Sequence, residues 1–171
     1  MRWAIAHYHE LALKGRNREY FEQCLIQNIR TALKDVGVRQ VQDLHSRIRI
    51  DLPLEANADV VRDRLVRVCG IANFSLGRVI PLQIANPDLA ALAEVAVEEI
   101  TATSGTTFRV TAKRADKRLA LTSMDIERTI GATICERTGK TVNLKNPDVT
   151  IYIELLSREA YCAAEKIEGP G

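Results

Sequence analysis

The sequence has few of the residues that a metal centre, a membrane span or a base-stacking surface needs. No two of its four cysteines form a Cys-x-x-Cys pair, and His7 and His9 are its only closely spaced histidines. Zinc sites need clustered cysteine or histidine, so we expect no metal site. Aromatic residues make up 5% of the chain, and no apolar run approaches the ~20 residues of a membrane helix. An integral membrane protein is thereby excluded, and stacking on single-stranded bases has little support.

The remaining composition is that of a globular protein. The 171 residues are 46% hydrophobic and 27% charged, which suits one ordinary domain or two small ones. The first residues run directly into a strand-like pattern and lack the layout of a signal peptide. We therefore expect a cytoplasmic protein with reduced thiols.

Residues 1–82 alternate between strand-like and helix-like periods. Ile48, Ile50 and Leu52 recur at every second position, as in a half-buried strand, whereas the apolar residues of 19–36 recur every three or four positions, as on one face of a helix. The predicted order is strand, helix, strand, strand, helix, strand, at residues 3–9, 19–36, 38–41, 48–52, 58–69 and 76–82. This β-α-β-β-α-β order is typical of a ferredoxin-like domain.

Residues 83–171 follow a different order, α-β-α-β-β. Asn86, Pro87 and Asp88 predict a helix start, with Asn86 as N-cap and proline in the first helical position. Thr122 and Asp125 resemble a capping box for a second helix that ends at Gly139. The strands are predicted at residues 108–112, 149–155 and 161–167. The fold class is therefore α+β, with domains at 1–82 and 83–171.

Two short basic segments are the strongest functional signal. Residues 1–82 carry 13 basic and 9 acidic residues, and residues 83–171 carry 11 and 13. Within each half, cationic residues gather in a strand-to-helix loop: Lys14, Arg16 and Arg18 in the first, and Lys113, Arg114, Lys117 and Arg118 in the second. Such loops can contact phosphates without disturbing a core. Either loop alone is better explained as a solvated loop, but two at equivalent strand-to-helix positions make RNA binding an equally good explanation.

No catalytic constellation stands out beside these loops. The sequence has no Gly-x-Ser-x-Gly, no glycine-rich phosphate loop before a helix and no cysteine–histidine pair in a recognisable spacing. We therefore expect no catalytic residues in this chain.

Six strings resemble the N-terminal half of the tRNA 4-thiouridine synthetase (tRNA sulfurtransferase) family. They occur in family order, at residues 10–18, 70–75, 108–118, 121–127, 143–148 and 165–171. The resemblance implies a ferredoxin-like domain followed by a THUMP domain, an RNA-binding module, and it associates the chain with tRNA modification and thiamine biosynthesis. It also implies that the basic loops contact the tRNA acceptor stem and 3′ end, with Asn73 and Arg109 near the same groove.

In this family a further ATP-pyrophosphatase domain activates the uridine, and a cysteine persulfide delivers the sulfur. The Ser-Gly-Gly-x-Asp-Ser loop that holds ATP does not occur in these 171 residues. We therefore expect no cofactor in this chain, and assign ATP and magnesium to that further domain, encoded downstream or separately.

Two other functions stay open at this point. The chain could be a free-standing THUMP adaptor that presents tRNA to a separate modifying enzyme. It could also be a ferredoxin-like regulatory module that binds a small metabolite, in which case the basic loops would be incidental.

Overall fold

The computed structural model describes residues 2–8, 17–44, 47–83, 87–115, 120–156 and 158–171. The chain divides into two units, Met1–Leu76 with Lys166–Gly171 and Gly77–Glu165. Strand β4 (Asn73–Pro81) begins in unit 1 and ends in unit 2. The last six residues therefore return to the first unit.

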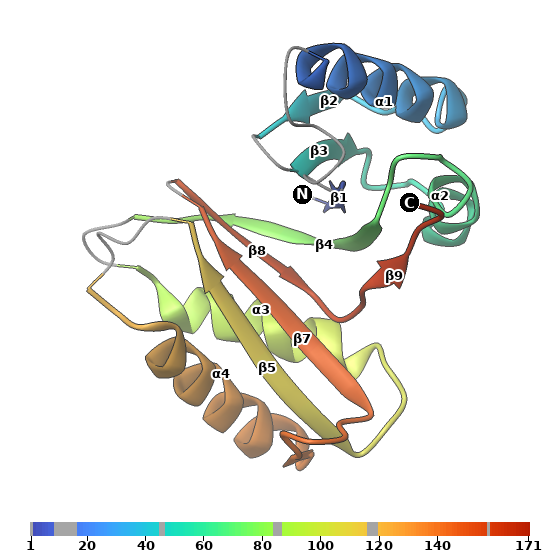
Figure 1. Ribbon diagram of the computed structural model, residues 1–171. Helices are drawn as coiled ribbons and strands as arrows, with labels where there is room; N and C mark the ends of the chain where they lie inside the picture. The colour runs from blue at the N-terminus through green and yellow to red at the C-terminus, as the bar shows by residue number, and fades with distance from the viewer. Residues whose placement is uncertain (1, 9–16, 45–46, 84–86, 116–119, 157) are drawn as a thin grey trace. The chain divides into compact units, whose positions relative to one another are not determined.

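Unit 1 contains a sheet and two helices, in the element order that the sequence predicts (Figure 1). Besides the start of β4, its elements are β1 (Arg2–His7), α1 (Arg18–Ala32), β2 (Gln40–Asp43), β3 (Arg47–Leu52), α2 (Ala58–Leu65) and β9 (Ile167–Glu168). The strand order is β2-β3-β1-β4. The β-α-β-β-α-β order predicted for this half is present.

The core of unit 1 forms between the apolar face of its strands and the apolar faces of its helices. On β3, Ile48 and Ile50 are completely buried, opposite Ala6 and Ala4 of the antiparallel strand β1. They belong to one apolar cluster with residues of α1 such as Ile29. The alternating strand and the three-to-four spacing of the helix thus bury their apolar faces against each other.

Both helices of unit 1 end earlier than predicted. Helix α1 ends at Ala32, several residues before Gly37. A tighter turn follows, in which Val36 N donates to Leu33 O (3.0 Å). Helix α2 likewise ends at Leu65 rather than near Gly70. In both cases the apolar spacing continues through a turn that still packs on the core, so periodicity alone overstates the helix length.

Unit 2 contains the end of β4, further strands of the same sheet and two helices. Its other elements are α3 (Leu89–Thr101), β5 (Thr107–Arg114), α4 (Ser123–Thr138), β6 (Thr141–Val142), β7 (Val149–Leu155) and β8 (Glu159–Ala163). The strand order is β4-β8-β7-β5-β6, with β5 parallel to both β7 and β6. Both helices cover the same face of the sheet (Figure 1).

The helix caps of unit 2 test the sequence interpretation directly. Thr122 and Asp125 form the predicted capping box at the start of α4, and Gly139 ends this helix with φ +69°. The prediction of Asn86 as the N-cap of α3 is wrong. The cap is Asp88, whose carboxylate accepts a hydrogen bond from Ala91 N (2.9 Å), so the helix begins after Pro87 and not at it.

The predicted strand 161–167 is in fact two strands that pair with different parts of β4. Strand β8 pairs with residues 78–81, and β9 pairs with Asn73 and Phe74. Beyond β9, Gly169 N donates to Ala72 O (2.9 Å). Alternating hydrophobicity predicts a strand but not its partner, which explains why the two strands are not separated in the sequence pattern.

Candidate nucleic-acid interface

The first basic loop is described only at its end, where Arg18 begins α1. Arg18 Nε lies 2.7 Å from Glu22 Oε1, and Tyr8 donates its hydroxyl proton to the same oxygen (2.7 Å). The hydrogen bond with Glu22, followed by that with Tyr8, raises the pKa of Arg18 above its usual range. Arg18 is therefore anchored over the first turn of α1. Lys14 and Arg16 lie outside the described residues.

Asn73 is the first residue of β4 and is half-buried. Its partner across the sheet is Glu168 of β9. The predicted RNA contact is thus located at a strand pair of unit 1.

The second basic segment begins on β5, where Lys113 and Arg114 extend to opposite faces of the sheet. Arg114 follows the core positions of β5 and donates from Nη1 to Leu121 O (2.7 Å), on the side of the helices. Lys113 is exposed on the other face, next to Glu154 of β7 in register. Lys117 and Arg118 lie outside the described residues.

Arg109 is on the same face of β5 as Lys113 but near the other end of the strand. They are four positions apart along the strand, so their Cα atoms lie about 13 Å apart. The Arg109 guanidinium donates from Nη1 to Leu144 O (3.3 Å) and from Nη2 to Thr150 Oγ1 (3.5 Å). The structure therefore does not bring Arg109 into one cluster with the basic residues at the end of β5.

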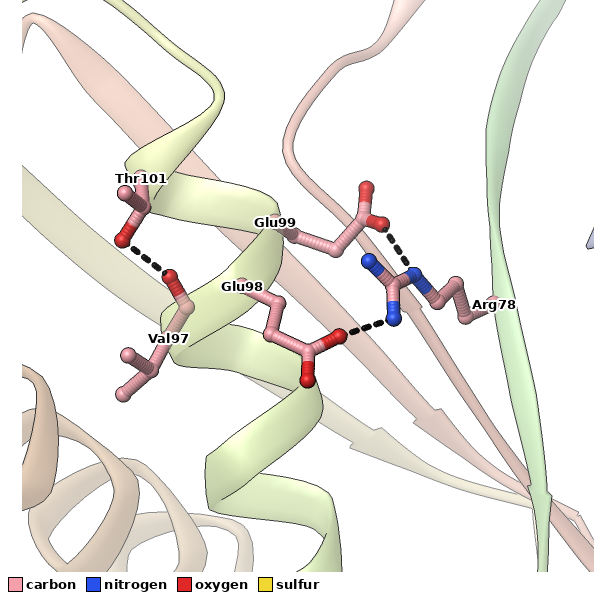
Figure 2. Close-up of polar contacts among 5 residues, drawn as sticks. All are labelled: Arg78, Val97, Glu98, Glu99 and Thr101. Atoms are coloured by element: carbon pink, nitrogen blue, oxygen red, sulfur yellow. Dashed lines mark hydrogen bonds and ion pairs between the residues drawn. The ribbon is translucent and has the colours of Figure 1, made fainter.

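Another arginine of unit 2, Arg78, was not a predicted site residue and forms ion pairs within the unit. Arg78 of β4 forms ion pairs with Glu98 and with Glu99 of α3, the latter at 2.9 Å (Figure 2). The Glu99 side chain is only 13% exposed and that of Arg78 34%, so this partly buried pair links strand and helix. We interpret Arg78 as structural rather than as a free cationic contact.

Cys162 belongs to the same part of the core. Burial, reinforced by the charge of Glu99 and opposed by Arg78, raises the pKa of its thiol to about 12. A thiol held in the protonated form is a poor nucleophile, so Cys162 has a packing role.

Other kinds of site find no support in the described residues. Among them, no group of three or more histidine, cysteine, aspartate and glutamate side chains could hold a metal ion. His9, one member of the only histidine pair, lies outside them. None of the described helices is long and apolar enough to cross a membrane.

Two family models match the chain, one on each half. The ThiI ferredoxin-like domain matches residues 4–75, and the THUMP domain matches residues 86–163. The chain thus pairs a ThiI ferredoxin-like domain with a THUMP domain. Its two domains occur in the order that the sequence resemblance implies, and the resemblance is confirmed.

The relatives that this chain resembles are longer than the chain itself. It is 33% identical over 168 residues to a probable tRNA sulfurtransferase of Moorella thermoacetica, a match that covers 98% of the chain and 41% of the relative. The crystal structure of PH1313 from Pyrococcus horikoshii Ot3 is 30% identical, with a TM-score of 0.83, and the match covers 99% of the chain and 55% of that structure. The chain thus spans about two fifths of the curated relatives and represents their ferredoxin-like and THUMP portion.

A third comparison includes RNA. A 4-thiouridine synthetase solved as an RNA complex with bound ATP has 25% identity and a TM-score of 0.82, over 99% of this chain and 42% of that one.

Proposed function

We propose that this chain binds the acceptor stem and 3′ end of tRNA, as the RNA-holding part of a tRNA sulfurtransferase. The observation that supports this most is the pairing of the two domains over nearly the whole chain, as in a 4-thiouridine synthetase solved with RNA. ATP, magnesium and the persulfide donor would act with an ATP-pyrophosphatase domain. Four free cysteines suit the reducing cytoplasm, the compartment we propose.

The proposed phosphate contacts come from the basic loops of both units. Lys113 is the strongest of the described residues, because its side chain is exposed at the end of a rigid strand. The full proposed set is Lys14, Arg16, Arg18, Asn73, Arg109, Lys113, Arg114, Lys117 and Arg118. Most of these are cations, so the set predicts affinity that depends on salt and little on base identity.

A salt titration of tRNA binding tests the contact at Lys113. Lys113→Ala should flatten the slope of log affinity against log salt by about 0.7–0.9, the value for one lost phosphate contact. Lys34→Ala is the matched control, because Lys34 is an equally charged, exposed residue outside the proposed set. An unchanged slope in Lys113→Ala, or an equal change in the control, would contradict the assignment.

Recognition of the tRNA end needs a separate experiment. Fluorescence anisotropy can compare intact tRNA with tRNA that lacks its 3′-terminal nucleotides. We expect the shortened tRNA to bind more weakly, and equal binding would contradict end recognition. A chain that binds neither RNA would refute the proposed function as a whole.

A further inference from the structure

The residues 143–148, between β6 and β7, form a loop whose backbone is held by its own side chains. The Asn143 carboxamide accepts from Lys145 N and from Asn146 N, both at 3.1 Å, and donates to Asn146 O (2.9 Å). Asn143 N in turn donates to Phe108 O of β5 (2.8 Å). The loop is therefore fixed to the sheet at its start.

The end of the loop is fixed just as firmly. One carboxylate oxygen of Asp148 accepts from Thr106 N and Thr107 N, both at 2.9 Å, while Asp148 N donates to Thr107 Oγ1 (3.0 Å). These bonds hold the Asp148 carboxylate against backbone donors at the surface of the loop. The remaining charge of the loop is the ammonium group of Lys145.

Arg109 supports the middle of the loop. Its Nη1 donates to Leu144 O, its Nη2 to Thr150, and its Nε is buried with no hydrogen-bond partner among the described residues. The guanidinium is therefore partly buried and directed at the backbone of the loop. A cation oriented in this way supports a loop better than it reaches a phosphate.

The side chains that these bonds leave outside are those of Leu144 and Lys145. Leu144 is 68% exposed, a large value for an apolar residue, and Lys145 is exposed beside it. A rigid backbone that presents one apolar and one cationic side chain loses little conformational entropy on binding. The pair matches the two chemical components of an unpaired nucleotide, an anionic phosphate and an apolar base face.

We propose that the loop 143–148 is an additional RNA contact, in which Lys145 binds a phosphate, Leu144 packs against an unpaired base, and Arg109 is a positioning residue. The inference rests on the proposed function and deepens it. It reassigns Arg109 from a direct phosphate contact to the support of Lys145 and Leu144.

Two loop-tip variants test the contact by salt-dependent tRNA binding. Lys145→Ala should flatten the salt slope by about 0.7, which corresponds to about fivefold weaker binding at 0.1 M salt. Leu144→Ala should weaken binding with the slope unchanged, since it removes no charge. Lys34→Ala again serves as the charge-matched control. Wild-type affinity and slope in Lys145→Ala would overturn the proposal.

The role of Arg109 is separated from a direct contact by a charge-preserving variant. Arg109→Lys keeps the positive charge but cannot reproduce the two-pronged contact with Leu144 and Thr150. If Arg109 positions the loop, Arg109→Lys binds as weakly as Arg109→Ala, and Arg109→Ala has no further effect in a chain that carries Leu144→Ala and Lys145→Ala. Near-wild-type binding by Arg109→Lys, or additive losses, would overturn the positioning role.

Failure of this inference differs from failure of the proposed function. If wild-type chain binds tRNA and the loop-tip variants bind equally well, only the loop assignment fails. If wild-type chain does not bind tRNA, the proposed function fails. Urea unfolding of each variant is the control for the fold, and we expect midpoints close to that of the wild type.

Discussion

Replacing one of two glycines of unit 2 with alanine should lower the stability of the fold, whereas replacing the other should raise it. Gly77 lies where β4 passes β8, and a Cβ placed there would be 2.1 Å from Cys162 O and 2.8 Å from Ala163 Cβ. The nearest atom belongs to the backbone, so it cannot rotate away as a side chain would. Gly131 lies inside α4, and a Cβ there would meet no atom within 4 Å.

The magnitudes follow from these two environments. For Gly77→Ala, an ordinary contact requires β4 and β8 to separate by about 1 Å, which disrupts the pairing of Arg78 with Cys162. Overpacking of this kind costs about 1–3 kcal/mol of unfolding free energy. Gly131→Ala should instead stabilise by about 0.5–1 kcal/mol, because alanine restricts the unfolded chain and favours a helix.

Urea unfolding followed by circular dichroism measures both effects. Because both glycines belong to unit 2, they report on the same part of the molecule. The midpoint should fall for Gly77→Ala and rise for Gly131→Ala, with m-values unchanged. A Gly77→Ala protein as stable as wild type would refute the close approach of β4 and β8, and a destabilised Gly131→Ala protein would refute the open space along α4.

Two further predictions concern titrating groups. Hydrogen bonds from the Thr107 and Thr106 backbones hold the pKa of Asp148 below its usual 3.8, so this group stabilises the fold above that pH and loses its contribution as the pH falls through the lowered pKa. The urea midpoint of wild type relative to Asp148→Asn should therefore decline on acidification, and a constant difference would argue against it. A thiol reagent on native protein should modify exposed Cys69 first and buried Cys162 last, as peptide mapping can check; early labelling of Cys162 would contradict its burial.

Local chemistry explains which elements could be predicted. The alternation of Ile48, Ile50 and Leu52 and the capping box at Thr122 are signals between residues close in sequence, and both correspond to the structure. The prediction of Asn86 as N-cap was wrong because a residue able to cap a helix stands on each side of Pro87. The hydrogen bond from Ala91 N to the Asp88 carboxylate identifies Asp88 as the cap.

The candidate site shows a similar limit. A positive charge is visible in the sequence, but its partner is not. Arg78 on β4 and Arg109 on β5 have the same side chain. Only the fold shows that one is held by two glutamates of α3 and that the other faces the carbonyl of Leu144.

The sequence by itself determined the order of the helices and of the longer strands, the α+β class and the family resemblance, because these depend on periodicity, capping residues and short motifs. The tertiary structure decided how the last residues divide between β8 and β9, which cations are committed to the fold, and that Leu144 and Lys145 share a fixed loop. These features arise between residues far apart in the chain, and the hydrogen bonds and ion pairs that create them exist only once the chain has folded.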